Sequence, residues 1–164
     1  MEKSELQERY KAVYGMAFNI AKKYHSRYPL PRSHSFFREV ETSITDAYKA
    51  DANFPIKFAQ EMLNTVCKWF LNSFDGIFKD DIQKIFNTAW SWHKKYIGAS
   101  FDDAKWDAAL NESNKMCETL PDGSSGILVA ALHEMDRANQ MAEWIAETTV
   151  NTTADTTTTT GETT

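Results

Sequence analysis

Three residues near the middle of the chain combine a titratable imidazole with two large aromatic rings, namely Trp90, Trp92 and His93. At about 100° per residue they fall in an apolar helical arc of about 160°. An imidazole in such surroundings can bind a ligand or transfer a proton, provided that burial lowers its pKa and a cavity adjoins it. The simpler interpretation is a core histidine with one hydrogen bond. Both interpretations stay open, and the three residues form a candidate pocket.

A second group of residues follows one face of a predicted helix near the C-terminus. Positions i, i+4, i+7 and i+11 hold His133, Arg137, Gln140 and Trp144, outside the apolar arc of that helix. Tryptophan and arginine are enriched among the residues that dominate protein–protein binding. We therefore predict that these four residues bind a partner protein. The alternative is that the bundle covers this face, or that Trp144 covers the helix end.

Basic residues gather around the end of the first predicted helix. The cluster consists of Lys22, Lys23, Arg27, Arg32 and Arg38, with tyrosines interleaved. Basic and aromatic side chains together are typical of surfaces that bind phosphates and stacked bases. Cations are also favoured at a helix C-terminus, however, and a pI of about 5.4 is low for a nucleic-acid binder. The cluster is a candidate phosphate or nucleic-acid contact, although the sequence as a whole disfavours a nucleic-acid partner.

The sequence contains no complete motif for a metal or a nucleotide. Residues 133–137 read HEMDR, with Arg137 where a zinc-binding helix needs a second histidine. None of the four histidines follows a glutamate by three residues, as di-iron bundles require. Cys67 and Cys117 are isolated and are predicted to be buried free thiols. We expect no metal and no cofactor, and the sequence favours a protein without enzymatic activity.

Six segments show the periodicity of amphipathic helices, and none shows the alternation of a strand. We predict helices over residues 5–28, 35–50, 55–73, 79–97, 101–118 and 126–147. Short links between helices favour antiparallel neighbours. The predicted fold is therefore all-α, a compact bundle of about six helices.

Individual residues predict the ends and inner faces of these helices. Ser4 fits a capping box, and Ser100 is a candidate N-cap of the fifth helix. Pro29 and Pro31 end the first helix. The second helix is predicted to pack through a stripe of Phe37, Val40, Ile44 and Ala47. The inner face of the sixth helix is predicted to follow Leu128, Ala131, Met135, Ala138, Ala142 and Ile145.

The length and composition fit one domain followed by a tail. The chain has 164 residues, of which 42% are hydrophobic and 25% charged, as in an ordinary globular domain. We predict a single helical domain over residues 1–147. Residues 148–164 are rich in threonine and poor in apolar side chains. Because such a segment buries too little surface to offset the entropy of ordering, a disordered tail is predicted.

Charge is distributed unevenly along the chain. Residues 1–100 carry 15 Lys and Arg against 11 Asp and Glu, whereas residues 101–164 carry 3 against 12. This asymmetry suits association with another protein or with a second copy, or complementary halves within one domain. No apolar run approaches the roughly 20 residues of a membrane span, and the N-terminus lacks a targeting pattern. We expect a cytoplasmic protein without a membrane partner.

The leading functional hypothesis is a non-enzymatic module that binds another protein as an adaptor, regulator or inhibitor. Its support is the missing catalytic motif, the aromatic excess, the charge asymmetry and the stripe on the sixth helix. One alternative is a small helical enzyme or ligand carrier with a site in the bundle near His93. Another alternative is a self-assembling structural protein in which basic and acidic halves of different copies pair.

Overall fold

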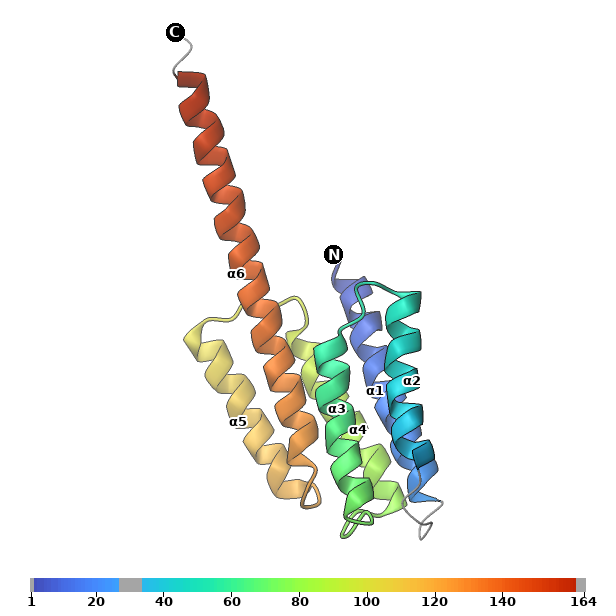
Figure 1. Ribbon diagram of the computed structural model, residues 1–164. Helices are drawn as coiled ribbons and strands as arrows, with labels where there is room; N and C mark the ends of the chain where they lie inside the picture. Colours follow the sequence, from blue (N-terminus) through green and yellow to red (C-terminus); the bar gives the residue numbers. More distant parts are fainter. Residues whose placement is uncertain (1, 27–33, 162–164) are drawn as a thin grey trace.

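The computed structural model describes residues 2–26 and 34–161, and it places the side chains of residues 2–26 and 35–150. This part of the chain is all helical and contains no strand, as predicted (Figure 1). The six helices are α1 (Lys3–His25), α2 (His34–Ala50), α3 (Ile56–Leu71), α4 (Lys79–Tyr96), α5 (Asp103–Thr119) and α6 (Ser125–Gly161). The predicted end of the first helix at Pro29 and Pro31 lies outside the described residues.

Four of the helices form the centre of the bundle. α1 contacts α3 and α4, and α6 contacts the same two helices, so the four enclose one core. α2 covers α1 and α3 on one flank, and α5 covers α4 and α6 on the other (Figure 1). Successive helices run in opposite directions, as the short links predict.

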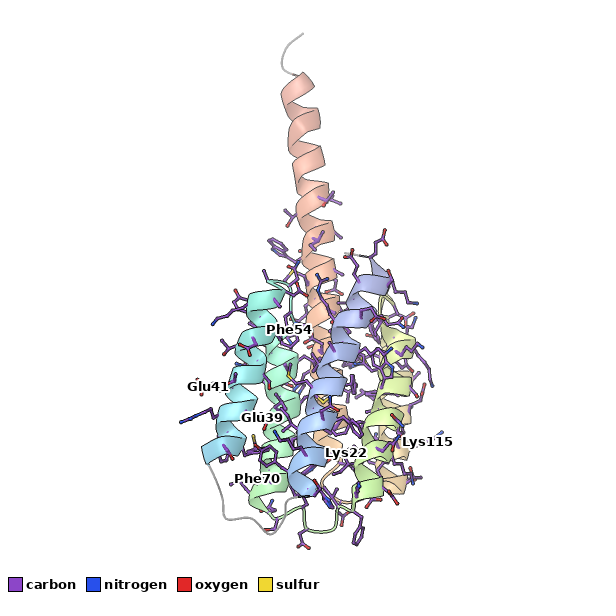
Figure 2. The ribbon with its side chains drawn as sticks, turned by 90° about the vertical axis from the view of Figure 1, so that its right-hand side faces the viewer. Lys22, Glu39, Glu41, Phe54, Phe70 and Lys115 are labelled. Carbon is purple, nitrogen blue, oxygen red and sulfur yellow. The ribbon has the colours of Figure 1, made fainter. Side chains whose placement is uncertain are left out.

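The second helix packs through a different phenylalanine from the one predicted. Phe36 is fully buried, and its ring stacks on Phe70 of α3 with the centroids 4.2 Å apart (Figure 2). Phe37 is 42% exposed, so the prediction that it packs into the core is wrong. Phe37 meets Phe70 edge-on from the surface, with the centroids 6.1 Å apart. The rest of the predicted stripe, Val40, Ile44 and Ala47, packs against the core as expected.

Three predictions about single residues are corrected by the structure. α1 begins at Lys3 with Glu2 as N-cap, so Ser4 lies inside the helix and forms no capping box. The N-cap of α5 is Asp102 rather than Ser100, because its carboxylate accepts a hydrogen bond of 2.8 Å from the backbone N–H of Lys105. Among the cysteines, Cys67 is half-buried and Cys117 is exposed, so the two thiols are not both buried.

α6 is longer than predicted and leaves the bundle. Leu128, Ala131 and Met135 are buried as expected. Ala142 and Ile145 are exposed, so the prediction that the inner face continues through them is wrong. Figure 1 shows the reason, because α6 extends past the ends of the other helices. The exposed side chains of residues 148–150 agree with a tail outside the core, and its disorder stays a prediction.

Candidate functional site

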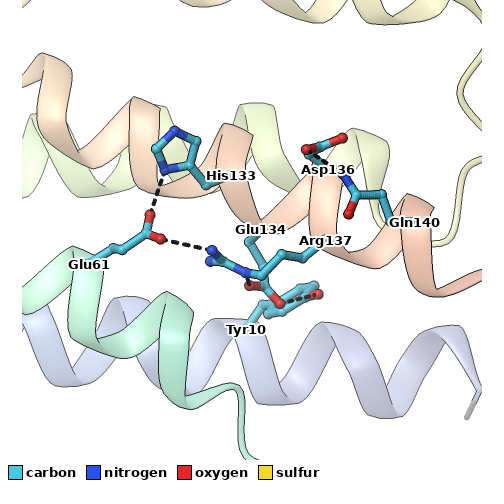
Figure 3. A network of polar contacts seen from close by, with 7 residues as sticks. All are labelled: Tyr10, Glu61, His133, Glu134, Asp136, Arg137 and Gln140. Atoms are coloured by element: carbon cyan, nitrogen blue, oxygen red, sulfur yellow. Dashed lines mark hydrogen bonds and ion pairs between the residues drawn. The ribbon is translucent and has the colours of Figure 1, made fainter.

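A network of polar side chains ties α6 to α1 and α3 (Figure 3). Arg137 lies at its centre and donates to Glu61 at 2.8 Å and to Glu134 at 2.9 Å. Glu134 also accepts a hydrogen bond of 3.1 Å from the hydroxyl of Tyr10. His133 contacts the other oxygen of Glu61 through Nδ1 at 2.8 Å. The network therefore fixes α6 just before the point where it leaves the bundle.

The two carboxylates of this network differ in their electrostatic surroundings. Burial raises the pKa of Glu134, against the effect of Arg137. Desolvation alone would also raise the pKa of Glu61, but the hydrogen bonds and charges of Arg137 and His133 hold it below its ordinary value. The Arg137 guanidinium thus forms ion pairs with both Glu61 and Glu134. Removing it would leave the Glu134 carboxylate buried without a cation.

The predicted partner-binding stripe is divided into an inner and an outer half. His133 and Arg137 both contact Glu61 of α3, although the His133 side chain is 59% exposed. Gln140 is exposed and donates to Asp136 one turn earlier in α6 at 2.9 Å. Trp144 is 61% exposed. His133 and Arg137 therefore contact the bundle, whereas Gln140 and Trp144 lie exposed on the surface.

Large apolar side chains gather on the outer part of α6. Met141 is 57% exposed, Trp144 61% and Ile145 53%. Their spacing of three and four residues places them on one side of the helix. We call these three residues the α6 patch. The nearby charged side chains are Glu143 and Glu147, and no lysine or arginine occurs between residues 138 and 150.

A cavity of about 210 Å³ lies at the end of the bundle where α6 emerges. It is enclosed by the start of α1, the link between α4 and α5, and α6. His93 lines it from α4. The other lining residues are Leu6, Tyr10, Tyr96, Ile97, Gly98, Ala99, Ser100, Phe101, Met135, Ala138, Asn139 and Ala142. The sequence does not reveal this cavity, because its walls come from three separate parts of the chain.

His93 is buried, with 1% of its surface exposed. Its Nδ1 lies 3.0 Å from the hydroxyl of Tyr14, and Tyr10 packs against its ring with the centroids 4.9 Å apart. Burial lowers the pKa of His93 to about 3, so the imidazole is neutral at physiological pH. His93 is thus a core histidine with one hydrogen bond, and it also lines a cavity, while its role in ligand binding or proton transfer stays a prediction.

The two tryptophans of the candidate pocket lie elsewhere. Trp90 is half-buried and packs on Tyr14, with the centroids 5.3 Å apart. Trp92 is buried beside the hollow between α4 and α5, and its indole Nε1 has no hydrogen-bond partner among the described residues. Adjacent residues on a helix point about 100° apart, which explains why Trp92 and His93 face different spaces. Of the three predicted residues, His93 is the one that lines the cavity.

The described part of the basic cluster makes contacts within the chain. Lys23 forms an ion pair of 2.9 Å with Glu39 of α2, and the buried Tyr24 donates to the same carboxylate at 2.6 Å. Lys22 lies over the ring of Phe18 at 5.7 Å from its centroid (Figure 2). Arg38 is exposed on α2. The predicted contacts Arg27 and Arg32 lie outside the described residues.

The described residues also bear on two other kinds of function, metal binding and membrane insertion. No group of three or more histidines, cysteines, aspartates or glutamates is arranged there to hold a metal ion. None of the helices is both long and apolar enough to cross a bilayer within those residues. Comparisons of the chain with protein-family models, curated proteins and solved structures gave no match.

Proposed function

We propose that this chain is a non-enzymatic module that binds another protein through the α6 patch. The observation that carries the proposal is the exposure of Met141, Trp144 and Ile145 together on a helix that has left its bundle. Large apolar side chains grouped on a surface favour a binding site, whereas single exposed ones do not. Tryptophan is also the residue most often found at the energetic centre of an interface.

The internal network supports this proposal because it holds the patch in place. Arg137 and His133 join α6 to α3 one to two turns before Met141. A helix anchored in this way presents its next turns in a fixed direction, so little ordering is needed when a partner binds. His133 and Arg137 then act as anchors of the binding helix rather than as contacts of the partner.

The charges around the patch define the partner. Glu143 and Glu147 lie within the same turns as Trp144, and lysine and arginine are absent from this stretch. Complementarity then favours a partner with an apolar groove flanked by lysine or arginine, into which one helix face fits. A second copy of this chain would bring two acidic helices together if the patches met each other.

The proposal is tested by comparing three baits in extract from the native host. The first is the unchanged chain, and the second carries Trp144→Ala with Ile145→Ser. The third carries Phe78→Ala, a matched control at a residue that is 72% exposed at the start of α4. We expect one protein to be retained in about equimolar amount by the first and third baits. The double variant should lose it at least about tenfold, as for an interface centre.

Two results would contradict this function. Equal retention of the same proteins by all three baits would show that the α6 patch is not the binding surface. A purified chain that forms a dimer at micromolar concentration, and becomes monomeric in the double variant, would identify a second copy as the occupant instead. Circular dichroism of each bait checks that helicity is unchanged.

A further inference from the structure

We propose that the cavity beside His93 binds a small uncharged ring compound that carries one hydrogen-bond acceptor. The proposal concerns a different site from the α6 patch and does not depend on the proposed function. It commits to the class of ligand from three properties of the cavity, namely its volume, its walls and the buried imidazole that lines it.

The volume limits the ligand to a single ring with a short substituent. The cavity measures about 210 Å³. An apolar cavity of about 150 Å³ in a protein core binds benzene. The additional space is enough for a substituent of two or three heavy atoms, and it is too small for a fused polycyclic cofactor.

The walls select an apolar and uncharged compound. Tyr10, Tyr96 and Phe101 contribute aromatic rings, and the last two stack with their centroids 5.7 Å apart. Leu6 and Met135 add aliphatic surface. No charged side chain lines the cavity, so a charged ligand would lose its hydration without gaining a counter-ion.

His93 supplies the polar group that orients the ligand. The Tyr14 hydroxyl is buried, and His93 Nδ1 is its one hydrogen-bond partner among the described residues. The hydroxyl proton is satisfied when Tyr14 donates to Nδ1, which places the remaining proton of the neutral imidazole on Nε2. His93 lines the cavity, and the one hydrogen bond that its ring makes among the described residues is through Nδ1, so Nε2 is the ring nitrogen that can meet a ligand. A ligand acceptor such as a carbonyl oxygen would satisfy this N–H.

A route into the cavity is present on the side of the α4–α5 link. Gly98 and Ser100 of this link and Ala142 of α6 are exposed and also line the cavity. The cavity is thus continuous with surface residues at its rim, and a ligand reaches His93 without passing through the core of the bundle.

The ligand class is tested with two probes of the same shape, acetophenone and α-methylstyrene. They differ in that acetophenone has a carbonyl oxygen where α-methylstyrene has a methylene group. Binding is followed through the backbone amide signals of residues 98–101 in ¹H–¹⁵N NMR spectra. We expect both probes to shift these signals, and acetophenone to bind about five to ten times more tightly, because it accepts the hydrogen bond from His93.

Variants distinguish the cavity from adventitious surface binding. Ala138→Leu and, separately, Ala142→Leu fill the cavity from α6 and should abolish the shifts, whereas the exposed Ala108→Leu on α5 should leave them unchanged. In the double variant Tyr14→Phe with His93→Phe, the preference for acetophenone should disappear. The proposal is overturned if neither probe shifts the signals, if both cavity-filling variants still bind, or if the two probes bind the unchanged chain equally.

Discussion

Tyr14 and His93 explain how two polar groups can lie in a wholly aromatic part of the core. The imidazole is surrounded by the rings of Tyr10, Phe58 and Trp90, and the Tyr14 hydroxyl is its hydrogen-bond partner in the described chain. A buried hydroxyl or ring nitrogen without a partner is costly, so the pair is stable only while both members are present. Burial also keeps His93 uncharged, with a pKa of about 3.

This burial predicts a loss of stability in acid. In the unfolded chain His93 titrates near its ordinary pKa of about 6.5, whereas the folded value is about 3. Between these two values the unfolded state binds a proton that the folded state does not. The free energy of unfolding should therefore fall by up to about 1.4 kcal/mol per pH unit as the pH is lowered below 6.5. Urea unfolding at a series of pH values from 7 to 4 measures this slope.

A matched variant separates His93 from the carboxylates that also titrate in acid. Tyr14→Phe with His93→Phe removes the imidazole and its partner together, so neither is left unpaired. Glu61, whose pKa is lowered in the fold, still loses its contribution as the pH falls through that lowered value. The double variant should be less sensitive to pH between 6.5 and 4.5. Identical slopes for both proteins would contradict the assignment.

The sequence predicts the burial of His93 and leaves its partner undetermined. The apolar arc of residues 79–97 places His93 on the inner face of its helix, which the structure confirms. Tyr14, its partner, lies 79 residues earlier in the chain. Periodicity shows which side of a helix is inward, and it carries no information on which helices meet there or how they are aligned.

At the level of elements, the end of α6 shows again that periodicity does not reveal which helices lie against a given face. Its stripe of apolar residues predicts the inner face correctly through Met135, where α3, α4 and α5 provide a surface to cover. Beyond that point the stripe continues in the sequence, but the neighbouring helices have ended (Figure 1). Ile145 has the pattern of a core residue and is exposed for this reason, so periodicity alone places one of the three residues of the α6 patch in the core.

The crossing of α6 with α3 depends on a glycine. A Cβ atom built on Gly126 would lie 2.6 Å from Oγ1 and 2.8 Å from Cγ2 of Thr65. Replacing a helical glycine with alanine usually stabilises a protein by about 0.5–1 kcal/mol. Here we expect Gly126→Ala to destabilise the chain by about 1–3 kcal/mol, because α6 must move away from α3. Urea unfolding at neutral pH gives the sign of the change.

The companion substitution Thr65→Ala identifies the cause. It removes the two nearest atoms, Oγ1 and Cγ2, and leaves only Cβ of residue 65 at 3.3 Å, so Gly126→Ala in the Thr65→Ala background should lose most of its cost. The two substitutions should therefore be strongly non-additive, as expected for residues in contact. Additive effects would mean that Gly126 is needed for another reason than close approach.

The whole molecule consists of a bundle and one helix that continues beyond it. All the side chains from residue 141 to residue 150 are exposed, whereas the network centred on Arg137 holds the preceding turns against α1 and α3. The part of α6 up to Arg137 therefore contributes to the stability of the bundle, and the part from Met141 onward carries the proposed binding surface. The all-helical architecture and the number of helices follow from periodicity and short links, while the ring of four central helices does not.

A pair of truncations tests this division. Removing residues 151–164 should leave the free energy of unfolding unchanged within about 0.5 kcal/mol, as for a surface change. Ending the chain after Asp136 also removes Arg137, which leaves Glu134 buried without its cation, and should destabilise the bundle by about 3 kcal/mol or more. Thermal and urea unfolding of both proteins measure the difference. A marked loss of stability in the first truncation would place the tail within the folded unit.

The five tryptophans of the chain differ widely in their access to solvent. Trp69 and Trp92 are buried, Trp90 and Trp106 are half-buried, and Trp144 is 61% exposed. A soluble quencher such as acrylamide therefore reaches Trp144 first, and the red edge of the fluorescence spectrum comes mostly from α6. The protein thus carries its own optical label at the place where a partner is proposed to dock, and binding can be followed without an added dye.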